Sequence, residues 1–487
     1  MLVIETPTKL RIIGHDDKIE RIQKILTYTD KSADFAIRQL RNANWFNPEV
    51  HGERLEELQA ERKKCLLMQD EQGLYTLAGF AALLKESLLE EEVVNKVVYP
   101  EPKVIPWKKV PPDLRDYQIE ARDILLAAKD GPVEIGTGLG KSFIIMHIVK
   151  MLGLKTVVMC PSTSIADQLY EDFTAYLGQG RVARFYGGKK DSSKLVTIAI
   201  SNSLARIEFD AGSESHYQQL SSAQVFIADE SHLVPASTLK DVCLGLFKDT
   251  PYRFFFSGTQ TRGDGAELLL RGIIGEMRYR MSVEDGVKAG WLARPSFKMV
   301  QVISNDGYQS ADVNKMTRRH LLYNPLVNKK AAGIANAAVS LLNHQVLILV
   351  DEIEQFAHLQ PLLKHKVAFA YGTLTSENEK WVQEQYRCKD NGKLIEDFNE
   401  GKIPILIGTS AVSIGTNIKT AQTGIYIRGG KSPIDVPQSV GRMTRLAPGK
   451  DSFTWIDFCV TNIDSLNRHS GDRIRLYREI YDDLEVI

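Results

Sequence analysis

The chain has 487 residues, about three times the size of an average domain, so we expect two or three domains and exclude a single small binding module. Hydrophobic residues make up 43% and charged residues 25%, which is ordinary for a globular protein and argues against a disordered chain or a fibre. Lys and Arg number 61 and are balanced by 61 Asp and Glu. Any surface that binds phosphate must therefore be local.

The five cysteines are scattered, and none has the spacing of a zinc or iron-sulfur site. This pattern indicates reduced thiols in a cytosolic protein. No apolar run reaches the roughly 18 residues that a membrane span needs. We expect a soluble, cytosolic protein without a membrane partner; protein partners cannot be read from the sequence.

Residues 1–107 carry short apolar periodicities of helical type, for example from Ile19 to Leu26, and are expected to form an accessory domain that contacts DNA. Arg38, Arg41, Lys63 and Lys64 are candidates for such a contact, with a salt-bridged helix surface as the alternative. Five prolines between residues 99 and 112 disfavour helix and central strand, so we place a domain boundary there.

After this boundary, short β-branched runs alternate with helical stretches, a pattern typical of parallel α/β sheets covered on both faces. It predicts two tandem domains, 108–295 and 296–465, followed by a helical tail, 466–487. The predicted strands are Thr156–Cys160, Leu195–Ile200, Val225–Ala228, Phe254–Ser257, Val346–Val350, Ile403–Ile407, Gly424–Ile427 and Phe453–Asp457.

A glycine-rich segment from Glu134 to Ser142 precedes an apolar helix-like run. Its glycines permit a tight loop whose amides converge on phosphate at a helix N-terminus, with Lys141 on the β and γ phosphates of ATP and Ser142 on Mg²⁺. Ile135 stands at the first glycine position of the strict P-loop pattern, and a plain structural turn is the alternative. The loop residues expected to bind nucleotide are Gly136, Thr137, Gly138, Gly140, Lys141 and Ser142.

A second candidate site follows the apolar strand at 225–228, which ends in the paired carboxylates Asp229 and Glu230. Such a strand can hold Mg²⁺ through Asp229 while Glu230 orients the attacking water. Alone, the pair would more often cap a helix. Downstream of a Gly-Lys-Ser loop, the catalytic interpretation is favoured.

With these two motifs and several others in order, residues 108–460 resemble the superfamily 2 helicases and translocases. The resemblance implies a P-loop NTPase with two tandem RecA-like domains, which bind ATP and nucleic acid between them. Leu114–Gln118 resembles the motif upstream of the P-loop, which implies that Gln118 bonds the adenine edge and that Arg115 lies near the base or the phosphates.

Other motifs of domain one imply nucleic-acid contacts and coupling. The segments 157–162 and 197–204 resemble strand-to-loop motifs that hold phosphates without reading bases. Asp229–His232 matches the DExH form of motif II, and Ser257–Arg262 resembles motif III. The implied nucleic-acid contacts are Pro161, Ser162, Ser201 and Asn202, and the implied coupling residues are His232, Ser257 and Thr259.

Two further motifs belong to the second domain. The stretch 398–417 resembles motif V and implies that Thr409 and Ser410 contact nucleic acid and Gly415 contacts nucleotide, although Asn417 replaces a frequent Asp. The stretch 438–445 matches motif VI, QxxGRxxR. Its spacing predicts one helical face with Gln438, Arg442 and Arg445, whose guanidinium groups would stabilise phosphoryl transfer.

The opening Leu-Arg-x-Tyr-Gln motif and the Ser-Gly-Thr-x-x-Arg motif resemble those of DNA translocases and of phage branch-migration helicases of the UvsW kind. The expected function is an ATP- and Mg²⁺-dependent DNA helicase that remodels forks and recombination junctions. Two alternatives stay open: a translocase subunit of a repair or restriction complex, and an ATP-gated nucleic-acid clamp without productive unwinding.

Overall fold

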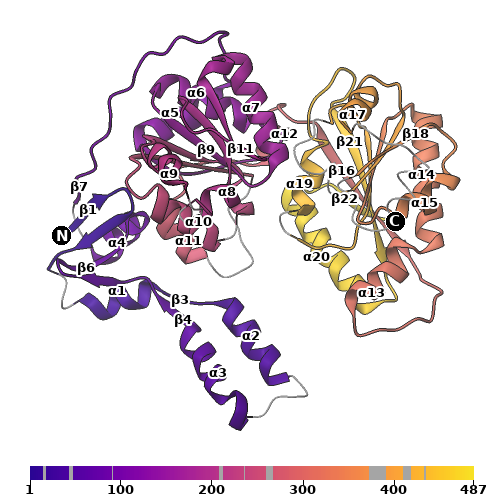
Figure 1. Cartoon of the computed structure of the whole chain (residues 1–487). Helices are drawn as coiled ribbons and strands as arrows, with labels where there is room; N and C mark the ends of the chain where they lie inside the picture. Colours follow the sequence, from indigo (N-terminus) through magenta and orange to yellow (C-terminus); the bar gives the residue numbers. More distant parts are fainter. Residues whose placement is uncertain are drawn as a thin grey trace. The chain divides into compact units, whose positions relative to one another are not determined.

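The computed structural model describes residues 1–14, 18–42, 48–89, 92–207, 212–234, 236–258, 267–371, 391–409, 418–432 and 435–487. They form two compact units, the first made of Met1–Ile135 and Gly140–Arg280, the second of Gly136–Leu139 and Met281–Ile487. Figure 1 shows both units and labels many of their helices and strands. None of the described helices combines the length and the apolar character that crossing a bilayer requires.

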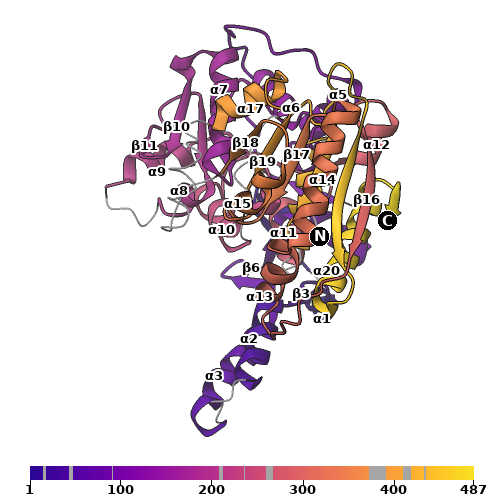
Figure 2. The ribbon, with the colours of Figure 1, turned by 90° about the vertical axis from the view of Figure 1, so that its right-hand side faces the viewer.

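The first 95 residues build a small α/β layer. Its sheet has the order β5 (Met68–Asp70), β6 (Gly73–Leu77), β2 (Lys9–Ile12), β1 (Leu2–Thr6), β7 (Val93–Asn95). Helices α1 (Ile19–Ile25) and α4 (Ala81–Leu88) accompany it. Between α1 and β5 the chain forms a second, two-stranded sheet, β3 (Thr27–Thr29) with β4 (Lys63–Cys65), and a pair of helices, α2 (Lys31–Asn42) and α3 (Pro48–Glu61), which lie side by side in Figures 1 and 2.

An eight-stranded sheet forms the centre of the first unit, in the order β11-β10-β12-β9-β13-β14-β8-β15. From β10 to β8 all neighbouring strands are parallel. The strands are β8 (Asp130–Ile135), β9 (Thr156–Cys160), β10 (Val182–Tyr186), β11 (Lys189–Lys190), β12 (Val196–Ile200), β13 (Val225–Ala228), β14 (Tyr252–Ser257) and β15 (Tyr279–Met281).

Helices connect these strands and cover the sheet because its strands are apolar on both faces. They are α5 (Asp116–Ala128), α6 (Lys141–Leu152), α7 (Thr163–Leu177), α8 (Ser201–Ala205), α9 (Glu214–Ser221), α10 (Ala236–Asp241) and α11 (Glu267–Ile274). The next helix, α12 (Val283–Lys288), belongs to the second unit.

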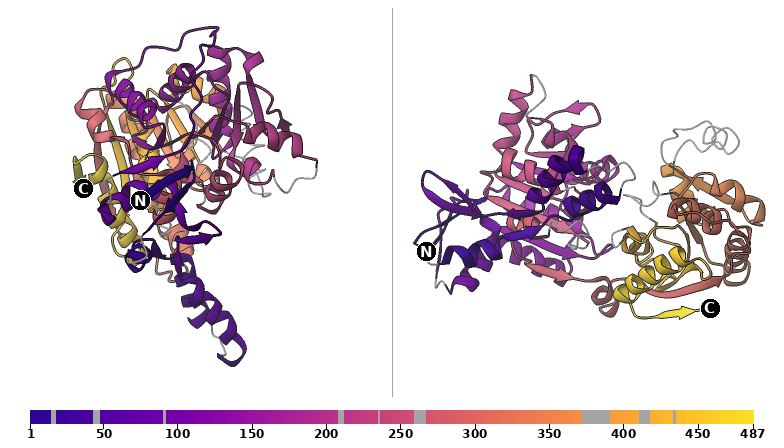
Figure 3. Two further views of the ribbon diagram at one scale, coloured as in Figure 1. Left: turned by 90° about the vertical axis from the view of Figure 1, so that its left-hand side faces the viewer. Right: turned by 90° about the horizontal axis from the view of Figure 1, so that it is seen from below.

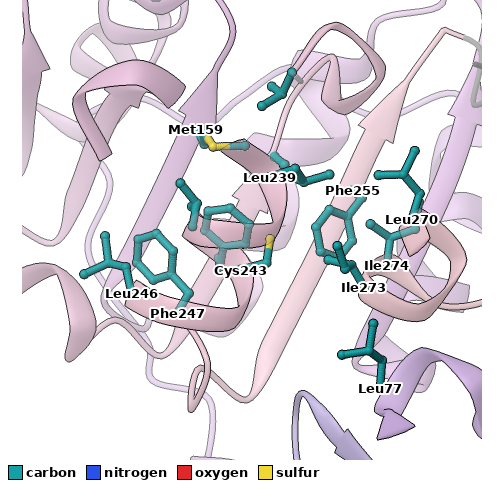
Figure 4. Close-up of a cluster of buried hydrophobic side chains, with 14 of the residues drawn as sticks. Leu77, Met159, Leu239, Cys243, Leu246, Phe247, Phe255, Leu270, Ile273 and Ile274 are labelled. Atoms are coloured by element: carbon teal, nitrogen blue, oxygen red, sulfur yellow. The ribbon is translucent and has the colours of Figure 1, made fainter. Parts of the chain in front are cut away.

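One hydrophobic cluster joins the small N-terminal sheet to the large one. Figure 4 shows part of it, with Leu77 of β6 beside Leu270, Ile273 and Ile274 of α11 and Phe255 of β14. A Cβ at Gly272 of α11 would come within about 3 Å of Leu77 and Phe80, so a side chain there would displace the packing. The limits predicted for the N-terminal domain stay a prediction, and its core is continuous with that of the large sheet.

The second unit contains a seven-stranded sheet, β18-β19-β17-β20-β21-β16-β22, whose neighbouring strands all run parallel. The strands are β16 (Arg294–Val302), β17 (Val346–Val350), β18 (Val367–Ala370), β19 (Ile405–Gly408), β20 (Thr423–Ile427), β21 (Ser452–Val460) and β22 (Leu484–Val486). Its helices are α13 (Val313–Thr317), α14 (Pro325–Leu342), α15 (Gln355–Leu359), α17 (Asn391–Asn399), α19 (Asp435–Gly441) and α20 (Asp464–Ile480).

The α/β fold with two parallel sheets is confirmed, and each of the eight predicted strands is found within two or three residues of its expected limits. The predicted helical tail contains α20, and the last residues add the edge strand β22 beside β16, as Figure 3 shows at the C-terminus. This strand is short and carries two acidic residues nearby, so the sequence pattern gave no signal for it.

A buried ion pair fixes α20 to the second sheet. The Arg473 guanidinium donates two hydrogen bonds to the Asp457 carboxylate on β21, at 2.6 and 3.1 Å, and both side chains are buried. The Tyr477 hydroxyl donates to the same carboxylate at 2.9 Å. Asp457 holds the pKa of Arg473 above its usual value although burial acts in the opposite direction. The charge is thus retained in the core.

We predict that Asp457→Ala lowers the stability of the second unit by about 3–5 kcal/mol, because it leaves the Arg473 charge buried without its partner. Tryptophan fluorescence during urea unfolding, which includes the buried Trp455, measures this. Arg475→Ala, on the exposed face of the same helix, is the matched control and should cost less than about 0.5 kcal/mol. Equal losses in both variants would contradict the argument.

Candidate active site

Most of the chemically important residues expected in the first unit lie at one edge of its sheet. Strands β8, β9, β12, β13 and β14 are parallel, so their carboxyl ends share this edge. The glycine-rich loop follows β8, Pro161 and Ser162 follow β9, and Asp229 and Glu230 follow β13. Ser201 and Asn202 begin α8 directly after β12. The topology therefore collects residues that are far apart in sequence.

The loop between β8 and α6 has the backbone expected of a phosphate-binding turn. Gly138 and Gly140 have φ of +90° and +75°, in the region that side chains disfavour, and Gly140 is the N-cap of α6. Ile135, which replaces the usual glycine, is the last residue of β8, and its side chain is buried in the core. A bulky residue is therefore accommodated without entering the loop.

Lys141 and Glu230 form an ion pair at the centre of this edge. The Nζ atom of Lys141 lies 2.9 Å from Oε1 of Glu230 and donates a hydrogen bond to the Ile135 carbonyl at 3.3 Å. The Lys141 side chain is 9% exposed and that of Glu230 16%. Because water is largely excluded, the two charges attract each other more strongly than a surface pair would.

The backbone around Asp229 and Glu230 is held in an unusual conformation. Glu230 has a φ of +49°, which few residues other than glycine adopt. Its amide donates to Oδ1 of Asp229 at 3.0 Å, and the Gly258 amide donates to Oε2 of Glu230 at 3.4 Å. The role of Gly258 could not be predicted from sequence, because only its backbone takes part. Strain of this kind is typical of functional sites.

The two neighbouring carboxyl groups differ in proton affinity. Burial, together with the adjacent Glu230, raises the pKa of Asp229 to about 7, and Lys141 only partly opposes this shift. Burial also acts to raise the pKa of Glu230, but the charges of Lys141 and His232 outweigh it and lower the pKa below the usual value. The negative charge therefore resides mainly on Glu230.

His232 connects this centre to the end of the neighbouring strand. Its Nδ1 shares a hydrogen bond with the Ser257 hydroxyl, 2.5 Å away, and lies 3.4 Å from Oε2 of Glu230. Both His232 and Ser257 are buried. The structure thus brings together two of the three residues expected to couple the sites, while Thr259 lies outside the described residues.

Gln118 is buried beside the loop, but its amide already contacts the protein. Oε1 accepts from the Arg115 amide at 2.9 Å, which satisfies a donor at the start of α5, and Nε2 donates to the Gly140 carbonyl at 3.4 Å. Arg115 in turn donates to the Tyr117 hydroxyl at 3.4 Å. An adenine that bonded Gln118 would share or replace these partners.

The residues expected to touch nucleic acid have mixed surroundings. Ser162 is the N-cap of α7, accepting from the Ile165 amide at 3.5 Å, and Asn202 is exposed at the start of α8. Ser201 is buried. In the second unit, Thr409 directly follows β19 and is buried, and Ser410 lies outside the described residues, as does Gly415 of the nucleotide set.

The prediction that Gln438, Arg442 and Arg445 share one helical face is wrong. Helix α19 ends at Gly441, so only Gln438 is helical, while Arg442 lies in the turn that follows and Arg445 in a bend after it. The reason is local. In a continued helix, the amide of residue 445 would donate to the Gly441 carbonyl. Here the Thr444 hydroxyl donates to that carbonyl instead, at 2.7 Å. Burial lowers the pKa of Arg445, and Arg442 is also buried.

These groups fit a nucleotide with magnesium. The positive-φ glycines at the N-terminus of α6 suit a polyphosphate, and Lys141 supplies a cation. Within the described part of the chain, no cluster of three or more His, Cys, Asp or Glu side chains could hold a metal. The Asp229 carboxylate after β13 and the Ser142 hydroxyl in the first turn of α6 are oxygen ligands of the kind that Mg²⁺ binds when phosphates and water complete its shell.

We predict that Asp229→Asn raises the melting temperature by a few degrees at pH 8, measured with EDTA and without nucleotide. A carboxyl whose pKa rises from about 3.9 to about 7 on folding destabilises the fold increasingly as pH rises through this interval. The gain should disappear near pH 4. Asp285→Asn is a control of opposite sign, because Ser282 lowers the pKa of Asp285. A gain independent of pH would contradict the assignment.

Comparison with known families matches both units. Residues 112–262 match the family described as type III restriction enzyme, res subunit, and residues 333–447 match the helicase conserved C-terminal domain. The first match contains the loop, Lys141 and the Asp229 motif, and the second extends through α19 to Arg445. The order of the two families along the chain is that of the two sheets.

Individual proteins are similar to this chain at low identity. The DNA 3'-5' translocase XPB2 of Sulfurisphaera tokodaii is 24% identical over 74% of this chain and 84% of its own length. The ATP-dependent DNA helicase uvsW of Enterobacteria phage T4 is 18% identical over 72% of this chain and 71% of its own.

Among solved structures, the ATP-dependent Type ISP restriction-modification enzyme LlaBIII bound to DNA has a similar fold, with a TM-score of 0.54 and 15% identity over 82% of this chain and 34% of that one. The two family matches, the relatives and the parallel sheets agree. The chain belongs to the superfamily 2 helicases and translocases, ATP-dependent motors with tandem RecA-like domains.

Proposed function

We propose that this motor hydrolyses ATP to move along DNA and to remodel branched DNA at forks and recombination junctions. The observation that carries the proposal is the buried ion pair of Lys141 with Glu230. It places the cation expected to bind phosphate next to the carboxylate expected to direct water. When a triphosphate binds, the contact between Lys141 and Glu230 is the one expected to change.

On this proposal the Lys141 ammonium, which contacts Glu230 in the structure, turns toward the phosphate when a triphosphate binds. Once released, the Glu230 carboxylate keeps its position through the Gly258 amide and its own strained backbone. Before nucleotide binds, Lys141 and His232 lower the pKa of Glu230 and favour the ionised form that a base orienting water needs, and His232 keeps this effect when Lys141 turns away. Nucleotide binding thereby prepares the residue that acts next.

Ser142 and Asp229 would hold Mg²⁺, which neutralises developing phosphate charge when bound. Asp229 suits this role because a nearby cation compensates for the burial that otherwise raises its pKa. Gln118 and Arg115 would contact the base end of the nucleotide. The remaining contacts would come from the loop residues Gly136, Thr137, Gly138 and Gly140.

From the second domain we propose that Arg442 and Arg445 stabilise the transferring phosphoryl group, with Gln438 and Gly415 on the nucleotide side. A turn can present two neighbouring arginines in one direction without the helical spacing that the sequence suggested. Removing such an arginine costs about 10³–10⁵ in rate in other NTPases. The domain limits 108–295 and 296–465 belong to the same proposal.

DNA is the proposed track, supported by the names of both relatives, which are DNA motors. Polar residues at the strand ends, Pro161, Ser162, Ser201, Asn202, Thr409 and Ser410, would contact its phosphates. His232, Ser257 and Thr259 would transmit changes at Glu230 toward these loops. The work would take place in the cytosol of a bacterium or of a phage-infected cell.

Branched DNA is favoured on energetic grounds. Opening one duplex step costs about 0.6–2.2 kcal/mol in stacking, whereas migrating a junction re-forms one pair for each pair broken. The likeness to uvsW points the same way. To migrate a junction, a motor therefore needs only to impose the direction of movement, without the energy to open the duplex at each step.

A second candidate is a translocase subunit of a restriction or repair complex. The observation in its favour is the match of residues 112–262 to the type III restriction res subunit. Such a subunit would turn over ATP on duplex DNA without exchanging or separating strands. An ATP-gated clamp without turnover is disfavoured, because Lys141, Asp229 and Glu230 are intact and assembled.

We predict DNA-stimulated ATPase activity that falls at least 100-fold in Lys141→Ala and in Glu230→Gln, because each change removes one member of the central pair. Phosphate release with and without DNA measures this. The controls are Lys150→Ala, at the far end of α6, and Glu214→Gln, exposed on α9, both with activity near that of the wild type. Full activity in the two site variants would refute the site.

We further predict that ATP hydrolysis drives strand exchange on four-way junctions and forks more efficiently than unwinding of linear duplexes. Gel analysis of labelled products on junctions, forks, linear duplexes and RNA hybrids at equal concentration makes the comparison, and Glu230→Gln controls for passive exchange. ATP turnover on duplex without any exchanged or separated product would instead support the translocase subunit.

A further inference from the structure

An aromatic side chain lies exposed at the start of the helix that carries Lys141. Phe143 is 37% exposed, whereas the six residues that follow it, Ile144 to Val149, are all buried. A phenylalanine that is partly in water loses part of the stabilisation that full burial of its ring would provide. The exposed ring is therefore not explained by the packing of α6 against its sheet.

The ring lies next to the amide of Gln118, across the Gly140 backbone. The Gly140 carbonyl accepts from the Phe143 amide at 3.1 Å and from Nε2 of Gln118 at 3.4 Å. A Cβ placed on Gly140 would come within 3.2 Å of Cδ2 of Phe143 and 2.7 Å of Nε2 of Gln118. One glycine thus brings an aromatic ring edge and a side-chain amide to the same point of the loop.

At Gly140 the loop therefore has one partly exposed aromatic ring and one side-chain amide beside it, both from the first unit. A nucleobase has apolar faces and a hydrogen-bonding edge, which match an aromatic ring and an amide respectively. A phosphate or a metal ion has no apolar face that could pack against such a ring.

We propose that Phe143 is a base-contacting residue of the nucleotide site, packing its ring against the purine and so favouring ATP over ligands without a base. This inference rests on the proposed ATPase function and adds to it a specificity residue. Phe143 follows Lys141 by two positions, so the same helix turn provides both the phosphate cation and the aromatic contact. Stacking of a base on an aromatic ring strengthens binding whichever base is present, because every base has a π-face.

The test compares two probes, ATP and inorganic tripolyphosphate, by calorimetric titration of the full chain with magnesium. Phe143→Ala should weaken ATP binding about five-fold or more and change tripolyphosphate binding less than two-fold. Phe143→Tyr, which keeps the ring, should restore ATP affinity. Met151→Ala is the matched control, because Met151 is 47% exposed on the last turn of the same helix.

Equal weakening of both probes in Phe143→Ala would show that the ring supports the phosphate loop, which overturns the inference. Unchanged ATP binding in that variant would overturn it as well, while the ATPase proposal would stand on the Lys141 variants. A wild-type chain that binds neither probe would instead remove the proposed function itself. The melting temperature of each variant confirms that the fold is intact, as expected for an exposed position.

Discussion

The candidate site of the first unit depends on how three largely buried ionisable groups are stabilised at the carboxyl edge of its sheet. Parallel topology brings a lysine and two carboxyl groups to one largely buried place, and unpaired charges there would be costly. An ion pair between Lys141 and Glu230 compensates for two of these charges, and the raised pKa of Asp229 favours its neutral form. On the function proposed above, a triphosphate and a divalent cation would provide further partners for these charges.

Much of the fold could be predicted because its strands are short, continuous apolar runs. The strands β9 and β17 match the expected limits fully, since both faces are covered and every residue is buried. Strands with mixed composition, such as β16 and the edge strand β22, gave no comparable signal. The continuity of the N-terminal core with the large sheet also escaped prediction, because it depends on packing between Phe80 and Gly272 rather than on any local pattern.

For the candidate site, the motifs predicted which side chains carry the chemistry, and the structure shows which partners those side chains contact. Lys141, Asp229 and Glu230 were recognisable from motifs, but the ion pair, the positive φ of Glu230 and the Gly258 amide depend on tertiary geometry. The helix predicted from the residue spacing of motif VI is wrong, because the Thr444 hydroxyl donates to the Gly441 carbonyl that a continued helix would use. In the sequence, Ile135 departs from the strict P-loop pattern. In the structure it is the buried last residue of strand β8, so the departure does not alter the loop.

The most direct test of the central claim is a crystal structure of the chain with ADP, beryllium fluoride, Mg²⁺ and DNA. The account predicts that Nζ of Lys141 leaves its position 2.9 Å from Glu230 and contacts the γ-phosphate mimic, with Mg²⁺ on Ser142 and Asp229. An unchanged ion pair, with the nucleotide analogue bound elsewhere on the chain, would contradict it.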